Sequence, residues 1–196
     1  MRQKYLEAKS FSLKYKMVFM KINSKIELKM ASESIIDDYF QSIHKDVSQD
    51  EYRDNLQKKY PTKEMILKRI KDMVGKTASD GTPDFFIYYE DELAGVFEFH
   101  PLTNDDYLEV GYWLFAEFRR KNILSEIFPH MIQYVAEHFN KSKIRATTAI
   151  DNDPSKRLLE KVGFIKTGKI FEEQVASGIQ REFEYMYFLP SVMAQE

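Results

Sequence analysis

The segment that decides the fold begins with Glu109-Val110-Gly111-Tyr112-Trp113-Leu114-Phe115 and continues, after a short turn, with Arg119-Arg120-Lys121-Asn122-Ile123-Leu124. The first run is typical of a strand, with Glu109 and Val110 on opposite sides. The second run is a basic turn that leads into a helix, because apolar residues then recur every three or four positions. These residues are Leu124, Phe128, Met131, Ile132, Val135 and Phe139. The segment is therefore predicted to be a strand, a basic turn and a helix with one buried face.

This basic turn is suited to hold a pyrophosphate. The first turn of a helix has N–H groups without partners in the helix and carries the positive end of the helix dipole. Arg119, Arg120 and Lys121 add three cations beside it. An anion is stabilised at such a helix start. A solvated basic turn before an ordinary helix explains the same residues, and this segment alone does not decide between the two.

A second segment of interest is Asn152-Asp153-Pro154-Ser155-Lys156-Arg157-Leu158-Leu159-Glu160-Lys161-Val162-Gly163-Phe164. Asp153 is expected to cap a short helix with Pro154 at its first position, and Gly163 is expected to end that helix. Capping does not account for Asn152 at the end of a strand or for Ser155 in the first turn. These two residues are therefore candidates for a functional role.

The rest of the chain indicates a mixed sheet with helices packed on it. Strands are expected at 25–30, 85–89, 93–99, 107–115, 143–150, 164–167, 172–176 and 183–189. Helices are expected after Ser32, over 49–59 and from Thr62 to a stop at Gly75. Pro129 should bend the long apolar helix or mark its late start. A tight turn at 90–92 joins two strands, and the right-handed crossover from 107 to 150 makes its two strands parallel.

Composition narrows the class of protein. A chain of 196 residues with 43% apolar residues fits one globular domain. The formal net charge of −2 gives no global field that would recruit nucleic acid or an anionic membrane. The absence of cysteine excludes a disulfide scaffold, a cysteine zinc site and a cysteine nucleophile. No apolar run has membrane length, and the four histidines do not form a metal set, so a cytoplasmic protein without a metal is expected.

Taken in order, the two segments resemble the GNAT superfamily of N-acetyltransferases, and most of all its branch that acetylates N-terminal amines of ribosomal proteins. The resemblance covers roughly 25–189 and is strongest over 109–164. In the first segment, Glu109-Val110-Gly111-Tyr112-Trp113-Leu114 resembles the branch's fourth strand, and Arg119 to Leu124 stands where the family has Arg-x-x-Gly-x-Gly/Ala. In the second segment, the matching motifs are Asn152-x-x-Ser155 and Glu160-Lys161-Val162-Gly163-Phe164. Gly168 and Gly178 have the spacing of the branch's final hairpin.

The sequence departs from this pattern at four positions. Asn122 replaces a glycine that would let the backbone take a positive φ beside phosphate. Asparagine is the best substitute for glycine in that conformation, so the loop is expected to keep its shape but to bind phosphate with weaker affinity. Arg120 also stands where the branch often has glycine, Leu124 replaces a small residue, and Phe171 stands where the branch often has arginine.

The resemblance implies an α/β (α+β mixed) fold with a central, mostly antiparallel, V-splayed mixed sheet of about seven strands and helices on both faces. A single domain over 21–196 would follow an appendage over 1–20. Acetyl-CoA is the implied co-substrate. The implied partners are this thioester and an amine acceptor, without nucleic acid or membrane, in a monomer or homodimer.

The resemblance also assigns roles to residues. Coenzyme A would pair with the strand end at Trp113, Leu114 and Phe115, whose backbone N–H would polarise the thioester carbonyl. The pyrophosphate would be held by main-chain N–H groups of Arg120, Lys121, Asn122, Ile123 and Leu124, with charge from Arg119, Arg120 and Lys121. Asn152 would bind the pantetheine arm.

Two side chains are candidates for proton transfer. Glu109 is the favoured base, directly or through water, because it lies mid-strand on the face opposite Val110. Ser155 is the candidate acid for the leaving thiolate. Their structural alternatives are a solvent-facing strand carboxylate and a hydroxyl in a helix first turn. Glu98 could face the acceptor amine, although surface exposure is expected, and Tyr185 and Tyr187 could line an acceptor groove.

The function expected from the sequence is acetylation of a primary amine, with a protein N-terminus as the first candidate. One alternative is acetylation of a small molecule such as a polyamine, an aminoglycoside or an amino acid. The other is a non-catalytic domain that binds acyl-CoA, which the altered phosphate loop keeps open.

Overall fold

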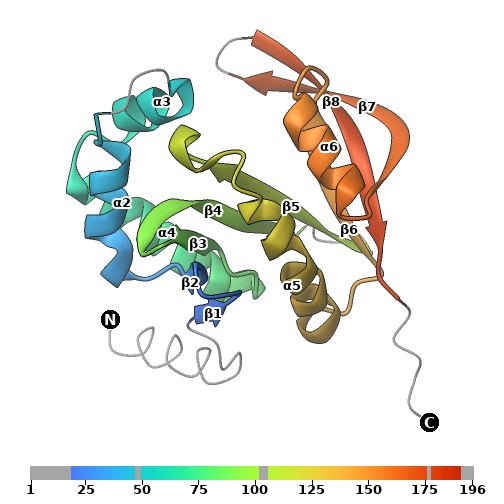
Figure 1. The fold of residues 1–196 in the computed structure, drawn as a ribbon, viewed down its shortest axis with the longest axis horizontal. Coiled ribbons are helices and arrows are strands. Elements are labelled where there is room, and N and C mark those ends of the chain that lie inside the picture. Colours follow the sequence, from blue (N-terminus) through green and yellow to red (C-terminus); the bar gives the residue numbers. More distant parts are fainter. Residues whose placement is uncertain (1–18, 47–49, 102–105, 176–177, 191–196) are drawn as a thin grey trace. The chain divides into compact units, whose positions relative to one another are not determined.

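The computed structural model describes residues 19–46, 50–101, 106–175 and 178–190 (Figure 1). They form a mixed α/β fold with an open, mostly antiparallel sheet, as expected. The strands are β1 (Phe19–Lys21), β2 (Ile26–Met30), β3 (Phe85–Tyr89), β4 (Glu92–Pro101), β5 (Tyr107–Leu114), β6 (Lys143–Ala149), β7 (Ile165–Val175) and β8 (Gly178–Phe188). The helices are α2 (Ile36–Ile43), α3 (Glu51–Lys59), α4 (Lys63–Asp80), α5 (Ile123–His138) and α6 (Asp153–Lys161), and the short 3-10 turns are η1 (Glu33–Ile35) and η2 (Ala116–Phe118).

The strands follow the order β1-β2-β3-β4-β5-β6-β8-β7, so the sheet has eight strands where about seven were expected. The chain groups into two compact units. The first comprises Met1–Phe99 and Tyr112–Ile123, and the second comprises His100–Gly111 and Leu124–Glu196. Strand β5 contributes residues to both. The boundary predicted at residue 20 stays a prediction, and β1, which begins at Phe19, pairs with β2.

In the first unit, β1, β2, β3 and β4 pair antiparallel. The predicted tight turn between β3 and β4 is confirmed: Tyr89 pairs with Glu92, and both Glu90 (φ 50°) and Asp91 (φ 66°) are left-handed, as in a two-residue hairpin turn. The core of this unit is aromatic and aliphatic. It includes Leu28, Tyr39, Ile43, Ile66, Ile70, Phe85, Ile87, Val96 and Phe97, all buried.

The expected end of α4 at Gly75 is wrong. The helix begins after the predicted cap Thr62, whose hydroxyl accepts from the Met65 N–H, and it continues through Gly75 to Asp80. Gly81 ends it with φ 80°, a left-handed conformation that glycine adopts without steric cost. An exposed glycine costs a helix only about 1 kcal/mol relative to alanine, so the helix tolerates Gly75 in its interior.

In the second unit, β5 and β6 are parallel, as the crossover predicted, and β8 pairs antiparallel with both β6 and β7. Two short strands expected at 164–167 and 172–176 form the single strand β7, whose register shifts between Lys166 and Ile170. The residues at this register shift were therefore mistaken for a break between two strands. The long helix α5 begins at Ile123, so Pro129 lies inside it and does not mark a late start.

The buried face of α5 differs in part from the expected one. Phe128, Met131 and Val135 are buried as expected, but Ile123, Ile127 and Tyr134 are also buried, whereas Leu124, Ile132 and Phe139 are half-buried. Phe128 packs edge-on against Phe164, whose ring also lies 5.5 Å from that of Tyr187. This cluster joins α5 to the strands that follow α6. None of the helices in the described ranges is long and apolar enough to cross a membrane.

Strand β4 approaches the end of β5 very closely at Gly95. A Cβ atom at this position would lie 2.1 Å from the Trp113 carbonyl oxygen and 2.9 Å from Leu114 Cδ2. The Phe115 N–H then donates to the Ala94 carbonyl at 2.9 Å. Glycine at position 95 therefore fixes where β5 ends and where the following turn begins.

We predict that Gly95→Ala lowers the free energy of unfolding by about 1–3 kcal/mol, because the backbone atoms around it have no room to move aside. The matched control is Gly75→Ala, where no atom lies within 4 Å of the added methyl group. This exposed helical position should gain about 0.5–1 kcal/mol. Urea unfolding measures both values, and equal effects for the two variants would contradict the close approach at Gly95.

Candidate functional site

The turn after β5 has a left-handed backbone at the two positions where the sequence lacks an expected glycine. Arg120 has φ 63° and Asn122 has φ 60°. In this conformation the Cβ of any side chain comes close to the following carbonyl oxygen. Asparagine tolerates it because its short polar side chain can hydrogen-bond locally, whereas arginine rarely adopts it. The backbone that glycine would provide is therefore present with other side chains, and α5 begins at the next residue, Ile123.

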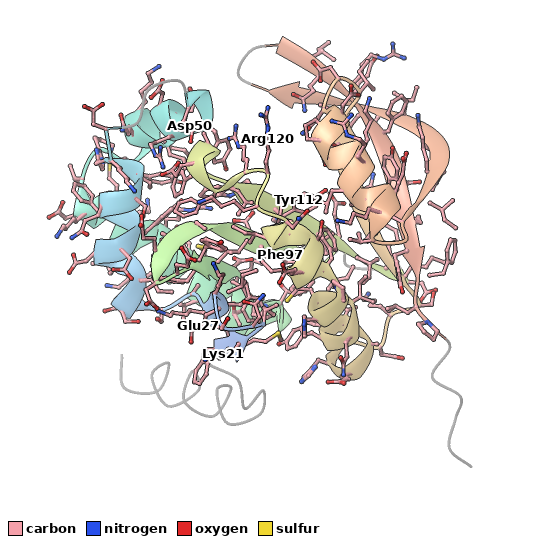
Figure 2. All side chains as sticks on the ribbon, viewed as in Figure 1. Lys21, Glu27, Asp50, Phe97, Tyr112 and Arg120 are labelled. Carbon is pink, nitrogen blue, oxygen red and sulfur yellow. The ribbon has the colours of Figure 1, made fainter. Side chains whose placement is uncertain are left out.

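The three cations of this turn differ in their surroundings. The Arg119 guanidinium donates from Nε to the Leu114 carbonyl at 3.1 Å. Lys121 Nζ lies 5.1 Å from the Tyr89 ring centre and 5.2 Å from that of Phe118. The exposed Arg120 guanidinium has no hydrogen-bond or ion-pair partner among the described residues, and its side chain extends away from the turn (Figure 2). Arg120 is thus the cation of the three that is most available to an anionic ligand.

The strand end that precedes this turn is packed among aromatic rings. Trp113 lies 4.8 Å from the ring of Tyr52 and 5.0 Å from that of Phe115. On the neighbouring residue of β5, Tyr112 stacks on Phe97 of β4 at 6.2 Å (Figure 2). The backbone of Trp113, Leu114 and Phe115, which was predicted to pair with coenzyme A, therefore has a fixed position within the first unit.

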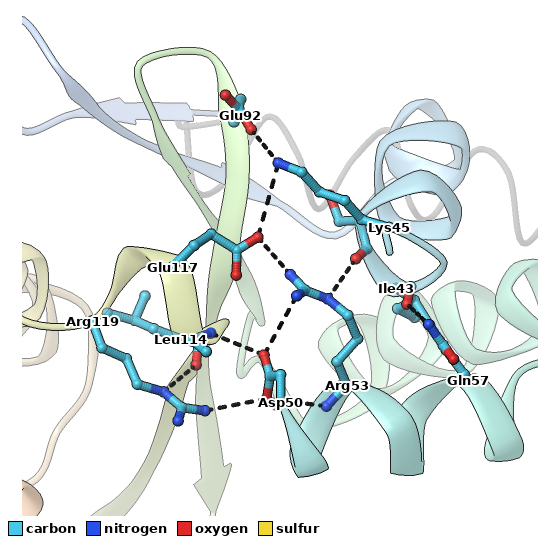
Figure 3. Close-up of polar contacts among 11 residues, drawn as sticks. Ile43, Lys45, Asp50, Arg53, Gln57, Glu92, Leu114, Glu117 and Arg119 are labelled. Carbon is cyan, nitrogen blue, oxygen red and sulfur yellow. Dashed lines mark hydrogen bonds and ion pairs between the residues drawn. The ribbon is translucent and has the colours of Figure 1, made fainter. Parts of the chain in front are cut away.

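A buried ionic cluster holds the same turn from the side of α3 (Figure 3). The carboxylate of Asp50, at the N-terminus of α3, accepts from the Ala116 N–H at 2.9 Å and pairs with Arg119 at 3.5 Å. Arg53 pairs with Glu117 at 2.6 Å, and its guanidinium lies 4.3 Å from the Phe115 ring centre. Sequence reasoning missed Asp50, Arg53 and Glu117. The spacing of Asp50 and Arg53 suggests a helix cap and gives no sign that both side chains are buried.

The segment after β6 contains a correction. The cap of α6 is Asn152 and not Asp153, because Asn152 Oδ1 accepts from the Ser155 N–H at 3.2 Å. Asp153 instead pairs with Lys156 at 2.6 Å, and Lys156 also donates to the Ile150 carbonyl. The Asn-x-x-Ser spacing therefore has a structural explanation as a helix cap. Ser155 is half-buried in the first turn of α6.

Glu109, the predicted base, is part of an ion cluster in the second unit. Its Oε2 accepts from Arg145 Nη1 at 2.6 Å, and its side chain is 22% exposed. Arg145 Nε donates to Glu184 at 3.0 Å, and Glu184 is only 3% exposed. The Thr167 hydroxyl and Lys169 also contact Glu184. Among the described residues Oε1 of Glu109 has no partner, so this oxygen is the one that could accept a proton.

Phe171 lies close to this ion cluster. Its ring centre lies 4.5 Å from the Arg145 guanidinium, and the ring centre of Tyr107 lies 5.7 Å from the same guanidinium. Where the related branch often has arginine, this chain therefore has a ring that contacts an arginine from another strand.

The other predicted side chains have partners as well. Glu98 was expected to be exposed, but it pairs with Arg69 of α4 at 3.1 Å and is 19% exposed. Tyr185 is buried, its hydroxyl donates to Glu160 at 3.3 Å, and burial together with that carboxylate raises its pKa. Tyr187 packs on Phe164, with its ring 3.1 Å from the position of a Cβ at Gly163. Both tyrosines therefore have contacts that belong to the core beside α6.

A strand that ends in a left-handed turn and leads into a helix, on a mostly antiparallel mixed sheet, places a helix N-terminus where an anion can bind. The chain belongs to the GNAT acetyltransferase family, since the model of that family, described as "Acetyltransferase (GNAT) domain", matches residues 26–165. The resemblance inferred from the two sequence segments is therefore confirmed.

Curated relatives from Bacillus subtilis (strain 168) match part of the chain. "Putative ribosomal N-acetyltransferase YdaF" is 26% identical over 53% of this chain and 57% of its own length. "Uncharacterized N-acetyltransferase YoaA" is 33% identical over 44% of this chain and 50% of its own length. The chain thus spans about half the length of these two relatives.

Solved structures match the fold along nearly their whole length. An acetyltransferase from Salmonella typhimurium that modifies the N-terminal serine of ribosomal protein L7/L12 has a TM-score of 0.73 and 17% identity, over 88% of this chain and 99% of that one. The microcin C7 self-immunity acetyltransferase MccE, in complex with acetyl-CoA and AMP, has a TM-score of 0.73 and 19% identity, over 86% and 95%. At this identity the likeness concerns the fold.

We predict that the left-handed backbone at residue 122 can be detected by substitution. Asn122→Gly should change the free energy of unfolding by less than about 0.5 kcal/mol. Asn122→Val should lower it by about 1–2 kcal/mol, because a branched side chain is strained at positive φ. Urea unfolding of the two variants beside the parent protein measures the difference. A valine variant as stable as the glycine variant would contradict the positive φ.

Proposed function

We propose that this chain transfers an acetyl group from acetyl-CoA to a primary amine, with a protein N-terminal amine as the first candidate acceptor. The observation that carries the proposal is the left-handed backbone at Arg120 and Asn122, directly before α5. This backbone fits a pyrophosphate, because it brings main-chain N–H groups and a helix start together beside an available guanidinium, that of Arg120.

In the proposed reaction the neutral amine attacks the thioester carbonyl carbon directly. A C–N bond forms, the C–S bond breaks, and the amine nitrogen loses a proton while the thiolate gains one. No covalent acyl-enzyme is needed, which agrees with a chain that has no cysteine. A backbone N–H at the end of β5, other than that of Phe115, which donates to the Ala94 carbonyl, would stabilise the charge that develops on the carbonyl oxygen.

Glu109 is proposed to accept the amine proton, directly or through one water, at its Oε1 atom. Its other oxygen is held by Arg145, so the carboxylate is fixed in orientation. Ser155 is proposed to give the proton to the thiolate and to regain one from solvent. Asn152 is proposed to contact the pantetheine arm with its amide N–H₂, because its oxygen caps α6.

The proposal of a protein N-terminus rests on relatives and on chemistry. The structure from Salmonella typhimurium matches this fold along 99% of its own chain and acts on the N-terminal serine of a ribosomal protein. An α-amine, with a pKa near 8, also needs less help from a base at neutral pH than a lysine with a pKa near 10.4.

We expect coenzyme binding to be measurable without knowledge of the acceptor. A concentration of acetyl-CoA 100 times its Kd should add about 2.7 kcal/mol to the stability of the folded chain, which a thermal shift detects. Adenosine monophosphate at equal concentration is the control. The absence of a shift at millimolar acetyl-CoA would rule out the proposed function.

Release of free thiol, followed with a colorimetric reagent, then separates the acceptor classes. Peptides with serine or alanine at the N-terminus should release thiol faster than polyamines, aminoglycosides or free amino acids if a protein N-terminus is the acceptor. Acetylation of a small molecule alone would move the function to that class. Coenzyme binding without any turnover would indicate a binding domain.

Glu109→Gln should lower kcat by roughly 10²–10⁴-fold, the range that general base catalysis contributes, and should flatten the dependence of kcat on pH. The Kd for acetyl-CoA should stay within a factor of about three, because Glu109 is not assigned to the coenzyme. Glu172→Gln, an exposed carboxylate on β7, is the matched control. A pH profile that keeps its shape in Glu109→Gln would remove this residue as the base.

A further inference from the structure

The turn proposed to bind phosphate is held by a carboxylate from a distant part of the chain. Asp50 is fully buried, with 0% of its side chain exposed. Its Oδ2 accepts from the Ala116 N–H at 2.9 Å, and its Oδ1 accepts from the Arg53 N–H at 3.3 Å and from Arg119 Nη2 at 3.5 Å. One carboxylate therefore joins the start of α3 to the backbone and to a side chain of the turn (Figure 3).

Arg53 completes this attachment. Its side chain is 1% exposed, its guanidinium lies over the ring of Phe115, and its Nε donates to the Ser42 carbonyl. Its Nη2 pairs with Glu117 at 2.6 Å, and its Nη1 lies 3.7 Å from Asp50. The guanidinium is hydrogen-bonded to two acceptors, the Ser42 carbonyl and Glu117, whereas Nη1 has no hydrogen-bond partner among the described residues. Rotation of η2 relative to α3 would therefore break the charged hydrogen bond to Glu117.

These contacts end immediately before the unfavourable backbone. From Phe115 to Arg119, contacts to α3, β4 or the end of β5 fix backbone or side-chain groups, and the next residue, Arg120, is left-handed. Arginine does not choose positive φ on its own, and such a conformation persists only where the surrounding contacts impose it. The Arg120 side chain has no hydrogen-bond or ion-pair partner among the described residues that could do so, whereas the residues directly before it are firmly attached.

We propose that Asp50 is a positioning residue for the coenzyme: its carboxylate imposes the left-handed turn at Arg120 and so gives the phosphate loop its binding shape. Asp50 itself does not touch the coenzyme. The inference rests on the proposed function, because it concerns the same loop. It differs from a purely structural role, in which Asp50 would stabilise the fold without regard to the conformation of Arg120.

A double-mutant cycle distinguishes the two roles. Asp50→Asn keeps the shape of the side chain but removes its charge, and Arg120→Gly makes the left-handed conformation accessible without external support. Titration calorimetry with acetyl-CoA gives the Kd of the parent protein, of each single variant and of the double variant. Urea unfolding of the same four proteins gives their stability. Asp54→Asn, an exposed carboxylate on the same helix, is the matched control.

We expect Asp50→Asn to raise the Kd at least tenfold, equivalent to about 1.4 kcal/mol. In the Arg120→Gly background the same substitution should raise the Kd less than threefold, because the glycine no longer needs the support. The cycle compares the fold-increase in Kd that Asp50→Asn causes in the parent protein with the fold-increase that it causes in the Arg120→Gly variant. Any direct contribution of the Arg120 guanidinium to binding therefore cancels. Asp54→Asn should leave the Kd unchanged.

The inference would be overturned if Asp50→Asn raised the Kd by the same factor in the parent protein and in the Arg120→Gly variant. An unchanged Kd in Asp50→Asn would also overturn it. If Asp50→Asn does not fold, Glu117→Gln takes its place, because Glu117 is partly exposed and its loss loosens the same attachment through Arg53. Glu117→Gln is then expected to raise the Kd more in the parent protein than in the Arg120→Gly variant, and an equal rise in both would contradict the inference. A parent protein that binds no acetyl-CoA would instead be a failure of the proposed function.

Discussion

The left-handed backbone at residues 120 and 122 is the constraint that the contacts around this turn have to satisfy. Glycine would adopt it freely, but this chain has arginine and asparagine there. A left-handed residue other than glycine or asparagine costs on the order of 1–2 kcal/mol, so the surroundings must supply that energy. They do so on two sides: β4 fixes the end of β5 through the close approach at Gly95, and α3 fixes η2 through Asp50. The loop is shaped by its neighbours more than by its own sequence.

Glu109 in the second unit is likewise held in its orientation by neighbouring residues. A base must hold its carboxylate in a fixed direction and still have an oxygen to receive the proton. Arg145 provides the direction, because its Nε donates to Glu184 and its guanidinium lies over the ring of Phe171. Removing one partner would leave the charge of the other partly shielded from water and without compensation, so this arrangement resists change once it has formed. An ion pair at Glu109 is therefore compatible with the proposed role, provided that Oε1 is the atom that reacts.

The sequence predicted the elements well because periodicity and turn chemistry are local properties. The strand at 85–89 and the tight turn at 90–92 follow from residues close together in the chain, and the parallel pairing of β5 with β6 follows from the rule for right-handed crossovers. The end of α4 was missed because Gly75 and Gly81 are equally plausible stops until the helix is seen to pass through the first. The Asp50 cluster was missed for a different reason: its partners lie more than 60 residues apart, and charge in a sequence is normally a sign of exposure.

The position of the cap on α6 changes how the Asn-x-x-Ser spacing should be understood. Capping was expected not to account for Asn152, but Asn152 is the cap, and this role is compatible with contact to the coenzyme. The cap uses only the side-chain oxygen, and an amide also carries an N–H₂ group with two donors. Because the cap fixes the Ser155 backbone at the start of α6, it also limits the directions that the serine hydroxyl can take. Capping is therefore the means by which a short, exposed helix start can hold a serine in a defined orientation.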